Sequence, residues 1–375
     1  MSTYSTSTYS ETVRELRSPR RVAQIPRSSL IPVRGVLHGV GVIVPLALGA
    51  ATDNLAHGTF AALGALPAGC AAIFGHRAGR RSAATAFLAA VGMAVAAFIG
   101  ALAAAEPVLL VPVIALFAYV AGIVTAFSDR VAVAALQWPL ALLMATVLPE
   151  PPSHAAVRAG FVLAGGLFQA ALASLIAAPA AIGAATGTQT DEAPARPPHR
   201  TPRVFVRHLV GTVRAHLGVR TEQGRHAVRM AAAAVVAQLA ALLLGLPHPY
   251  WAALTALVVL KSDHVITVRR GLDRIGGTAL GVVLGILLAA FAALGTAPLL
   301  IGAAVAVTLA YTVFPANYFL FTTFLTGFVV LLLDLLGQSA HQMAGARLLG
   351  TLLGGTIALV ASHVRPAAGK RHLSD

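Results

Sequence analysis

Acidic side chains are scarce in this sequence. Its 375 residues include 13 Asp and Glu against 27 Lys and Arg, so the formal net charge is +14 at pH 7. Charged residues make up only 11% of the chain, whereas a soluble globular domain usually carries about 25%. This shortage excludes an ordinary soluble protein, and the hydrophobic share of 57% indicates an integral membrane protein.

Cysteine is almost absent as well. The single thiol, Cys70, has no partner in the chain for a disulfide. The sequence contains no CxxC or HExxH pattern and no recognisable pair of nucleophile and base, so we expect no metal, no cofactor and no enzymatic activity. Excess arginine in a membrane protein usually lies in cytoplasmic loops beside anionic headgroups, and we therefore expect no nucleic-acid partner.

The apolar runs predict an all-α membrane protein with about twelve transmembrane helices, because a hydrocarbon core about 30 Å thick requires roughly 20 apolar residues per helix. The first six expected helices cover residues 36–51, 58–75, 83–104, 107–126, 131–148 and 155–178. The second six cover residues 226–246, 249–265, 273–294, 298–314, 317–335 and 343–363. The predicted segments are a partly disordered N-terminal segment (1–35), a first six-helix repeat (36–178), a linker (179–225), a second six-helix repeat (226–363) and a tail (364–375).

Nearly all basic residues fall on one side of this arrangement. They lie in the N-terminal segment, the even-numbered loops, the linker and the tail, whereas the other side carries Asp53, Glu106, Glu150 and Asp334. The positive-inside rule therefore predicts a plasma (inner) membrane protein whose termini and linker are cytoplasmic, beside an anionic inner leaflet.

The two halves resemble each other. The segment FAAL at Phe60 corresponds to WAAL at Trp251, 191 residues later, and Arg158 corresponds to Arg347. Arg77, Arg81 and Thr85 correspond in the same way to Arg270, Arg274 and Thr278. Because six is an even number, two repeats of six helices have the same orientation in the membrane. Transporters built in this way usually bind substrate where the repeats meet.

The most informative pattern is a helical stripe between residues 267 and 281. Its members follow one another at steps of three and four, apart from one adjacent pair: Thr267, Arg270, Arg274, Gly277, Thr278 and Gly281. Because a guanidinium group matches a carboxylate bidentately, we interpret Arg270, Arg274 and Thr278, with Arg77 and Arg81, as candidate anion-binding residues at the cytoplasmic mouth. Arginines that only set the membrane topology explain the same pattern, and both interpretations stay open.

The second half resembles the fusaric-acid-resistance (FUSC) family. The resemblance rests on RHAVRMA (225–231), YWAALTALVVL (250–260), D-x3-T-x2-R-x3-R-x2-GT-x2-G (263–281) and ARLLGTLLGG (346–355). It implies export of small aromatic or other organic acids, driven by the proton gradient. The chain departs from the family pattern at Ser262, where proline is common, and its short linker replaces a longer cytoplasmic domain.

Several other residues are candidates for the same task. Tyr250 and Trp251 either stack on an aromatic substrate or belong to the interfacial aromatic belt. Arg158 and Arg347 open the last span of each half from the outer side, and they either bind substrate or form outer salt bridges, with Asp334 as the partner of Arg347.

Proton coupling has three candidates, because no expected span has a carboxylate near its centre. They are Asp263, Asp334 and His38. Asp263 follows an unusually short apolar run, and short segments often mark transporter sites, but a helix cap explains it equally well. Gln137 is a further residue that could line a path.

The sequence thus predicts an exporter of small organic anions. A passive organic-anion channel and a non-transporting membrane scaffold remain alternatives, and association into a homo-oligomer is compatible with all three.

Overall fold

The computed structural model describes residues 26–74, 80–104, 106–125, 129–146, 151–186, 221–290 and 295–364. Within these ranges the chain forms twelve α-helices, two short 3-10 helices (Arg27–Ser29 and Pro152–His154) and no strand, which confirms the predicted fold class. The first half comprises α3 (Pro32–Ala51), α4 (Leu55–Phe74), α5 (Arg80–Ala103), α6 (Pro107–Val124), α7 (Asp129–Met144) and α8 (Ala155–Thr186). The second half comprises α10 (Glu222–Leu243), α11 (Tyr250–Val259), α12 (His264–Ala289), α13 (Thr296–Val313), α14 (Tyr318–Leu335) and α15 (Ala340–His363).

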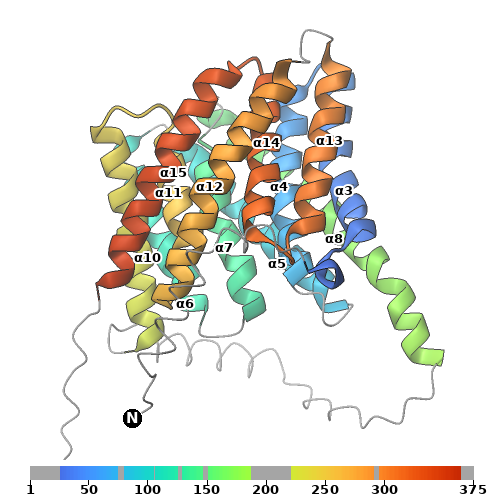
Figure 1. The fold of residues 1–375 in the computed structure, drawn as a ribbon, viewed down its shortest axis with the longest axis horizontal. Coiled ribbons are helices and arrows are strands. Elements are labelled where there is room, and N and C mark those ends of the chain that lie inside the picture. The colour runs from blue at the N-terminus through green and yellow to red at the C-terminus, as the bar shows by residue number, and fades with distance from the viewer. Residues whose placement is uncertain are drawn as a thin grey trace, which may run out of the picture.

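The helices run alternately up and down in one bundle. Helix α3 begins, α8 ends, α10 begins and α15 ends at the same end of the bundle, at the bottom of Figure 1. We call it the linker end and the other the opposite end. By length and composition, nine of the described helices could cross a membrane, whereas α6, α7 and α11 are shorter apolar helices.

The boundaries around α11 differ from those expected. Helix α11 has ten residues, about 15 Å at the usual rise. Helix α12 begins at His264, whereas the corresponding span was expected to begin at residue 273. The reason is the N-cap: the Asp263 carboxylate accepts a hydrogen bond from the Ile266 N–H at 2.9 Å, so the helix includes its polar, arginine-bearing first turns.

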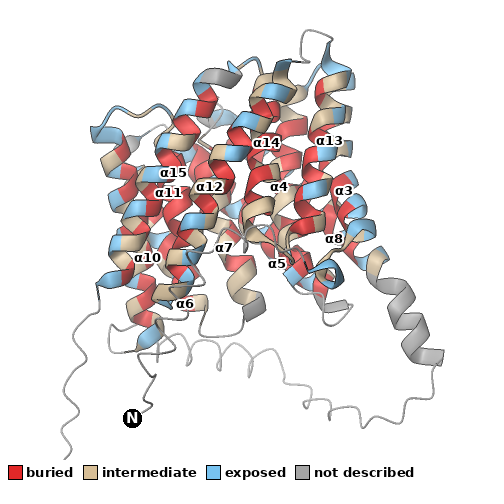
Figure 2. Cartoon of the chain, in the orientation of Figure 1, coloured by how far each residue is buried: buried red, intermediate tan, exposed pale blue. Residues whose placement is uncertain are grey.

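Small residues bring the helices close together. A methyl group on Gly277 of α12 would lie 2.6 Å from the carbonyl oxygen of Phe319 in α14, and one on Gly281 would meet the carbonyl of Thr323. Such contacts are typical of helix packing in membranes, where small residues allow backbones to approach. Figure 2 shows the result: buried residues face the interior of the bundle, and exposed residues lie on its outer faces.

Helix neighbours correspond between the two halves. In the first half α3 packs on α4, α4 on α8, and α5 on both α7 and α8. In the second half the contacts are α10 with α11, α11 with α15, and α12 with both α14 and α15. The halves meet chiefly where α6 packs on α10 and where α13 packs on α3, and these two contacts also correspond to each other.

Candidate functional site

A cavity of about 180 Å³ lies between the two halves. Helices α4 and α7 of the first half form one wall, and α11, α12, α14 and α15 of the second half form the other. Most of the lining is apolar, with leucines from both halves and the aromatic rings of Phe74, Phe314 and Phe321. We call this space the arginine cavity, for the reason given next.

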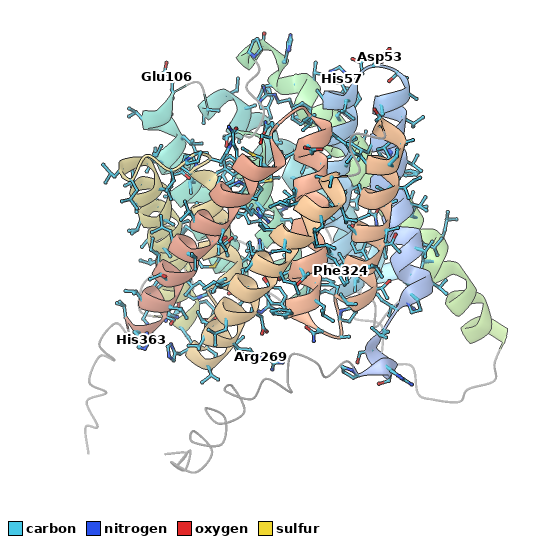
Figure 3. All side chains as sticks on the ribbon, turned by 45° about the horizontal axis from the view of Figure 1, so that its top comes forward. Asp53, His57, Glu106, Arg269, Phe324 and His363 are labelled. Atoms are coloured by element: carbon cyan, nitrogen blue, oxygen red, sulfur yellow. The ribbon has the colours of Figure 1, made fainter. Side chains whose placement is uncertain are left out.

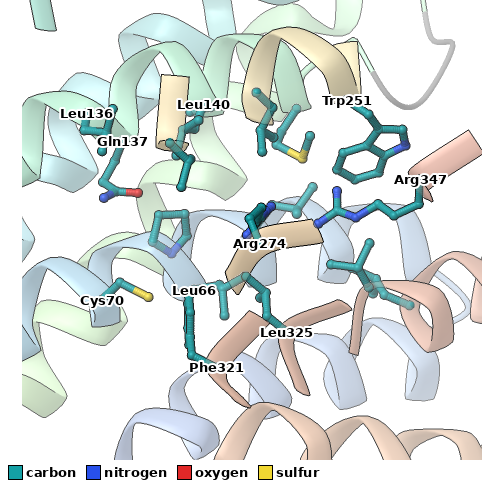
Figure 4. A pocket seen from close by; sticks show the side chains of 18 of the residues that line it. Leu66, Cys70, Leu136, Gln137, Leu140, Trp251, Arg274, Phe321, Leu325 and Arg347 are labelled. Carbon is teal, nitrogen blue, oxygen red and sulfur yellow. The ribbon is translucent and has the colours of Figure 1, made fainter. Parts of the chain in front are cut away.

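Three arginines line this apolar space: Arg270 and Arg274 from α12, and Arg347 from α15. Arg274 is only 2% exposed and Arg347 only 4%. Figure 4 shows both guanidinium groups directed into the cavity. No acidic side chain is among the residues that line it. The described residues that line the cavity therefore bring positive charge to it and no carboxylate.

Aromatic rings hold two of these arginines. The guanidinium carbon of Arg347 lies 3.7 Å from the centroid of the Trp251 ring, and that of Arg270 lies 4.8 Å from the centroid of the Tyr318 ring. Such cation–π contacts contribute about 0.5–2 kcal/mol each and orient the side chain without neutralising its charge. Stacking occupies the flat face of a guanidinium group and not its N–H edges.

Several polar atoms around the cavity are buried without a hydrogen-bond partner. They include Nε of Arg274, Nε of Arg347, the Trp251 indole nitrogen and the hydroxyls of Tyr250 and Tyr318. A buried polar group left unpaired costs about 1–3 kcal/mol, and more if it is charged. An anion with acceptor oxygens would satisfy donors that the described part of the protein leaves unsatisfied.

The structure brings together residues that the sequence placed apart. Arg270 and Arg274 were expected at the cytoplasmic mouth and Arg347 at the outer side. Arg274 instead lies ten residues into α12 and Arg347 seven residues into α15, so the two converge from opposite ends on one cavity. Trp251 lines the cavity, as does Gln137, and Tyr250 packs beside Trp251 with ring centroids 4.7 Å apart.

Not all of the candidate residues that the structure describes line the arginine cavity. Thr278 is fully buried on the same face of α12 as Arg274, but it does not line the cavity. Arg77 lies outside the described residues, and so does the side chain of Arg81. Arg347 stacks on Trp251 and, within the described part of the chain, forms no ion pair with Asp334, so the suggested salt bridge is wrong.

Arg158 occupies a separate place. Its Nη1 donates a hydrogen bond to the carbonyl of Ala145 at 2.8 Å, and its guanidinium carbon lies 5.4 Å from the centroid of the Phe60 ring. Both residues line a small space of about 10 Å³ within the first half. Arg158 and Phe60 correspond in sequence to Arg347 and Trp251, and the two pairs make the same type of contact.

The three candidates for proton coupling lie away from the arginine cavity. Asp263 is exposed and caps α12. Asp334 does not line the cavity, although its neighbours Leu332, Leu333 and Leu336 do. His38 is buried, and its Nδ1 lies 2.6 Å from Nε2 of Gln169.

The sequence did not indicate Tyr318, which lines the cavity and whose ring makes the cation–π contact with Arg270. The one signal that could have indicated it is the aromatic segment YFLF at residues 318–321, directly after the Asn317 cap of α14. The cap fixes Tyr318 at the first position of the helix, at the linker end.

Comparison with known families identifies the half that supplies these arginines. Residues 232–361 match the model of the family described as fusaric acid resistance protein-like. This segment of the chain is similar to that family. All three arginines and Trp251 lie inside the fusaric acid resistance protein-like segment, and the similarity suggests a role in membrane transport or efflux. No protein of curated function and no solved structure matches the chain.

Proposed function

We propose that the protein exports small organic anions, aromatic carboxylic acids among them, through the arginine cavity. The observation that carries this proposal is an apolar cavity lined by three arginines and by no acidic side chain. Such a lining selects for a ligand that combines an anionic group with an apolar body. A volume of about 180 Å³ restricts the ligand to a small molecule, since sites for drug-sized ligands are about 300–1,000 Å³.

The chemistry of an aromatic carboxylate fits the groups on the wall. A carboxylate accepts two parallel hydrogen bonds from one guanidinium group. When the carboxylate approaches the side of the guanidinium group, Nε is one of the two donors. Nε of Arg274 and Nε of Arg347 are buried without partners. The ring of the ligand would lie among Leu66, Leu140 and Leu325, which line the cavity beside them.

The arrangement of helices supports a transporter built from two repeats. The corresponding helix neighbours, and the matching pairs Phe60–Arg158 and Trp251–Arg347, favour an internal duplication with an axis along the membrane normal. In such transporters the substrate binds where the repeats meet, and the arginine cavity lies between the halves.

The distribution of charge supports one orientation of the protein in the membrane. Asp53 and Glu106 lie at the opposite end of the bundle from Arg269 and His363, as Figure 3 shows. Together with the arginine-rich linker, this favours an inner-membrane protein whose linker end is cytoplasmic and lies beside anionic lipid. An organic acid is ionised in the cytoplasm, so an exporter would meet it there as the anion.

The test is efflux of benzoate and of fusaric acid from cells that either contain or lack this protein. We expect faster efflux with the protein, a response to the pH gradient in inverted vesicles, and loss of both in Arg274→Ala at normal membrane abundance. Arg269→Ala is the matched control, because Arg269 is an exposed arginine of the same helix that does not line the cavity. Currents that follow voltage alone would indicate a passive channel. Unchanged efflux by Arg274→Ala, or no effect of the protein on any tested acid, would contradict the proposal.

A further inference from the structure

A second cavity, of about 440 Å³, opens at the linker end of the bundle. It lies among the end of α6, the first half of α7, the start of α10 and the segment between α11 and α12. Its polar lining comes from Glu222, Gln223 and His226 of α10 and from Lys261 and Ser262. We call it the linker-end cavity.

One side chain lines both cavities. Leu136 of α7 faces the linker-end cavity and also the arginine cavity. Along the same helix, Val133 faces only the linker-end cavity, whereas Gln137 and Leu140 face only the arginine cavity. Helix α7 is thus the wall between the two spaces, and Leu136 is the side chain that a small molecule would pass.

Two nitrogen-bearing side chains, His226 and Lys261, line the linker-end cavity. His226 is 4% exposed, and its Nδ1 has no hydrogen-bond partner. The Lys261 side chain enters the same space from the segment that precedes α12. Glu222, which is exposed in the first turn of α10, also lines this cavity, on the same face of the helix as the buried His226.

Lys261 is linked electrostatically to the arginine cavity. Burial, and secondarily the positive charge of Arg270, lower the pKa of the Lys261 ammonium group to about 7. Arg270 itself lines the arginine cavity. An anion in either space therefore favours the charged form of Lys261, because an opposite charge nearby stabilises the ammonium group.

We propose that the linker-end cavity is a second binding site for small organic carboxylates, held there by Lys261 and His226, and that the anion moves from it past Leu136 into the arginine cavity. This inference rests on the proposed function and adds to it the route and the first binding site. The Lys261 ammonium group and an Nδ1–H of His226 donate to the carboxylate. The apolar side chains of Met230, Leu260 and Leu136 contact the body of the molecule.

The site has a defined dependence on pH. The charged or titratable residues near Lys261 are His226 and Glu222 of α10, Arg270 of α12 and the exposed Asp263, and Arg229 of α10 acts on His226. The described lining residues of α6 and α7 are uncharged. Since the ammonium form of Lys261 binds the anion, and this form is lost as the pH rises through about 7, anion arrival slows from pH 6 to pH 8.

The experiment follows the arrival of benzoate in the arginine cavity. The chain has two tryptophans, and of these Trp251 lines that cavity whereas Trp138 does not. In a Trp138→Phe background, the fluorescence of Trp251 reports binding in the full-length protein. Equilibrium titration with benzoate, repeated with fusaric acid, tests the proposed function, and stopped-flow mixing tests the route.

We expect Leu136→Ala to speed the fluorescence change and Leu136→Phe to slow it, because the side chain at this position lies between the two cavities. Leu143→Ala is the control, since Leu143 lies on the same helix and lines neither cavity. Lys261→Gln should lower the association rate of benzoate at pH 6 by about tenfold, because the positive charge that attracts the anion is lost. The association rate of this variant should no longer depend on pH. Arg269→Gln removes an equal charge outside both cavities and should have no such effect.

The outcomes distinguish a failure of the proposed function from a failure of the proposed route. If neither acid changes the Trp251 signal at equilibrium, the proposed function fails and this inference fails with it. If the signal titrates normally but the rates of the Leu136 and Lys261 variants equal those of their controls, the anion reaches the arginine cavity by another route. The inference is then wrong, and the proposed function stands.

Discussion

Replacing Arg274 by methionine should make the empty protein more stable and its complex with an organic anion weaker. Arg274 is 2% exposed, lines a cavity with Arg347 and Arg270, and faces no acidic side chain there. Methionine has a similar length and leaves no polar atom unpaired. The two effects have opposite signs because the charge is unfavourable in the empty cavity and favourable when an anion is bound.

Both magnitudes can be worked out from the cavity. A sphere of 180 Å³ is about 7 Å across, and two unit charges about 7 Å apart repel by roughly 2 kcal/mol at an effective dielectric constant of about 20. Removing Arg274 should therefore raise the free energy of unfolding by roughly 2 kcal/mol. Loss of a hydrogen bond to a charged ligand costs about 1.5–3 kcal/mol, so benzoate should bind about 10- to 150-fold more weakly.

Thermal unfolding of the purified protein, with and without benzoate, measures both quantities. Arg274→Met should melt at a higher temperature than wild type in the absence of benzoate, and benzoate should raise its melting temperature less. Thr278→Val is the control: Thr278 is buried one turn along the same face, its hydroxyl has no partner, and it does not line the cavity. We expect normal benzoate binding from that variant. A lower melting temperature for Arg274→Met would show that the guanidinium group is part of the packing of the protein, and the reasoning about uncompensated charge would be refuted.

Four other substitutions test the remaining features. Gly281→Ala should lower the free energy of unfolding by about 1–3 kcal/mol, because the added methyl group meets the carbonyl of Thr323. Gly345→Ala should raise the free energy of unfolding by about 1 kcal/mol, because no atom lies within 4 Å of the added methyl group. Thermal unfolding of the two variants measures this difference. Asp263→Ala should cost about 1 kcal/mol through loss of the cap of α12, and efflux in vesicles should keep the same dependence on pH, which a proton-coupling Asp263 would not allow. Arg158→Leu should destabilise the first half by removing the hydrogen bond to Ala145, yet the affinity for benzoate in the fluorescence titration should not change.

Much of this fold follows from the sequence. Runs of apolar residues determine twelve helices, since each helix must satisfy its own backbone in a membrane. The stripe on α12 was predicted from its period alone, and Thr267, Arg274, Gly277, Thr278 and Gly281 are indeed the buried face of that helix. Periodicity succeeds here because a helix turns by a fixed angle per residue, whatever surrounds it.

The composition of the cavity could be predicted only in part. The distribution of arginines between loops predicts orientation, but it contains no information about depth, and Arg347 was therefore assigned to the outer surface. Its actual neighbour, Trp251, belongs to a short helix whose start lies deep enough to meet α15. Leu136 could not be singled out, since nothing in its sequence context distinguishes it from the other leucines of α7. Its significance comes only from the two spaces that it separates.

The contacts between the halves have a consequence for movement. At α3 and α13, Gly35 and Gly39 lie against Thr312 and Thr308, and at α6 and α10, Gly122 lies against Ala227. Glycine and alanine have no rotamers, so at Gly122 and Ala227 helices α6 and α10 can slide past each other without a side chain changing its conformation there. The contact of α3 with α13 differs, because Val42, Leu46 and Tyr311 belong to one buried apolar cluster there. Large interlocking side chains, in contrast, hold two helices in one register. Of the two contacts between the halves, the one between α6 and α10 is therefore the place where one half can shear against the other at the lower energetic cost.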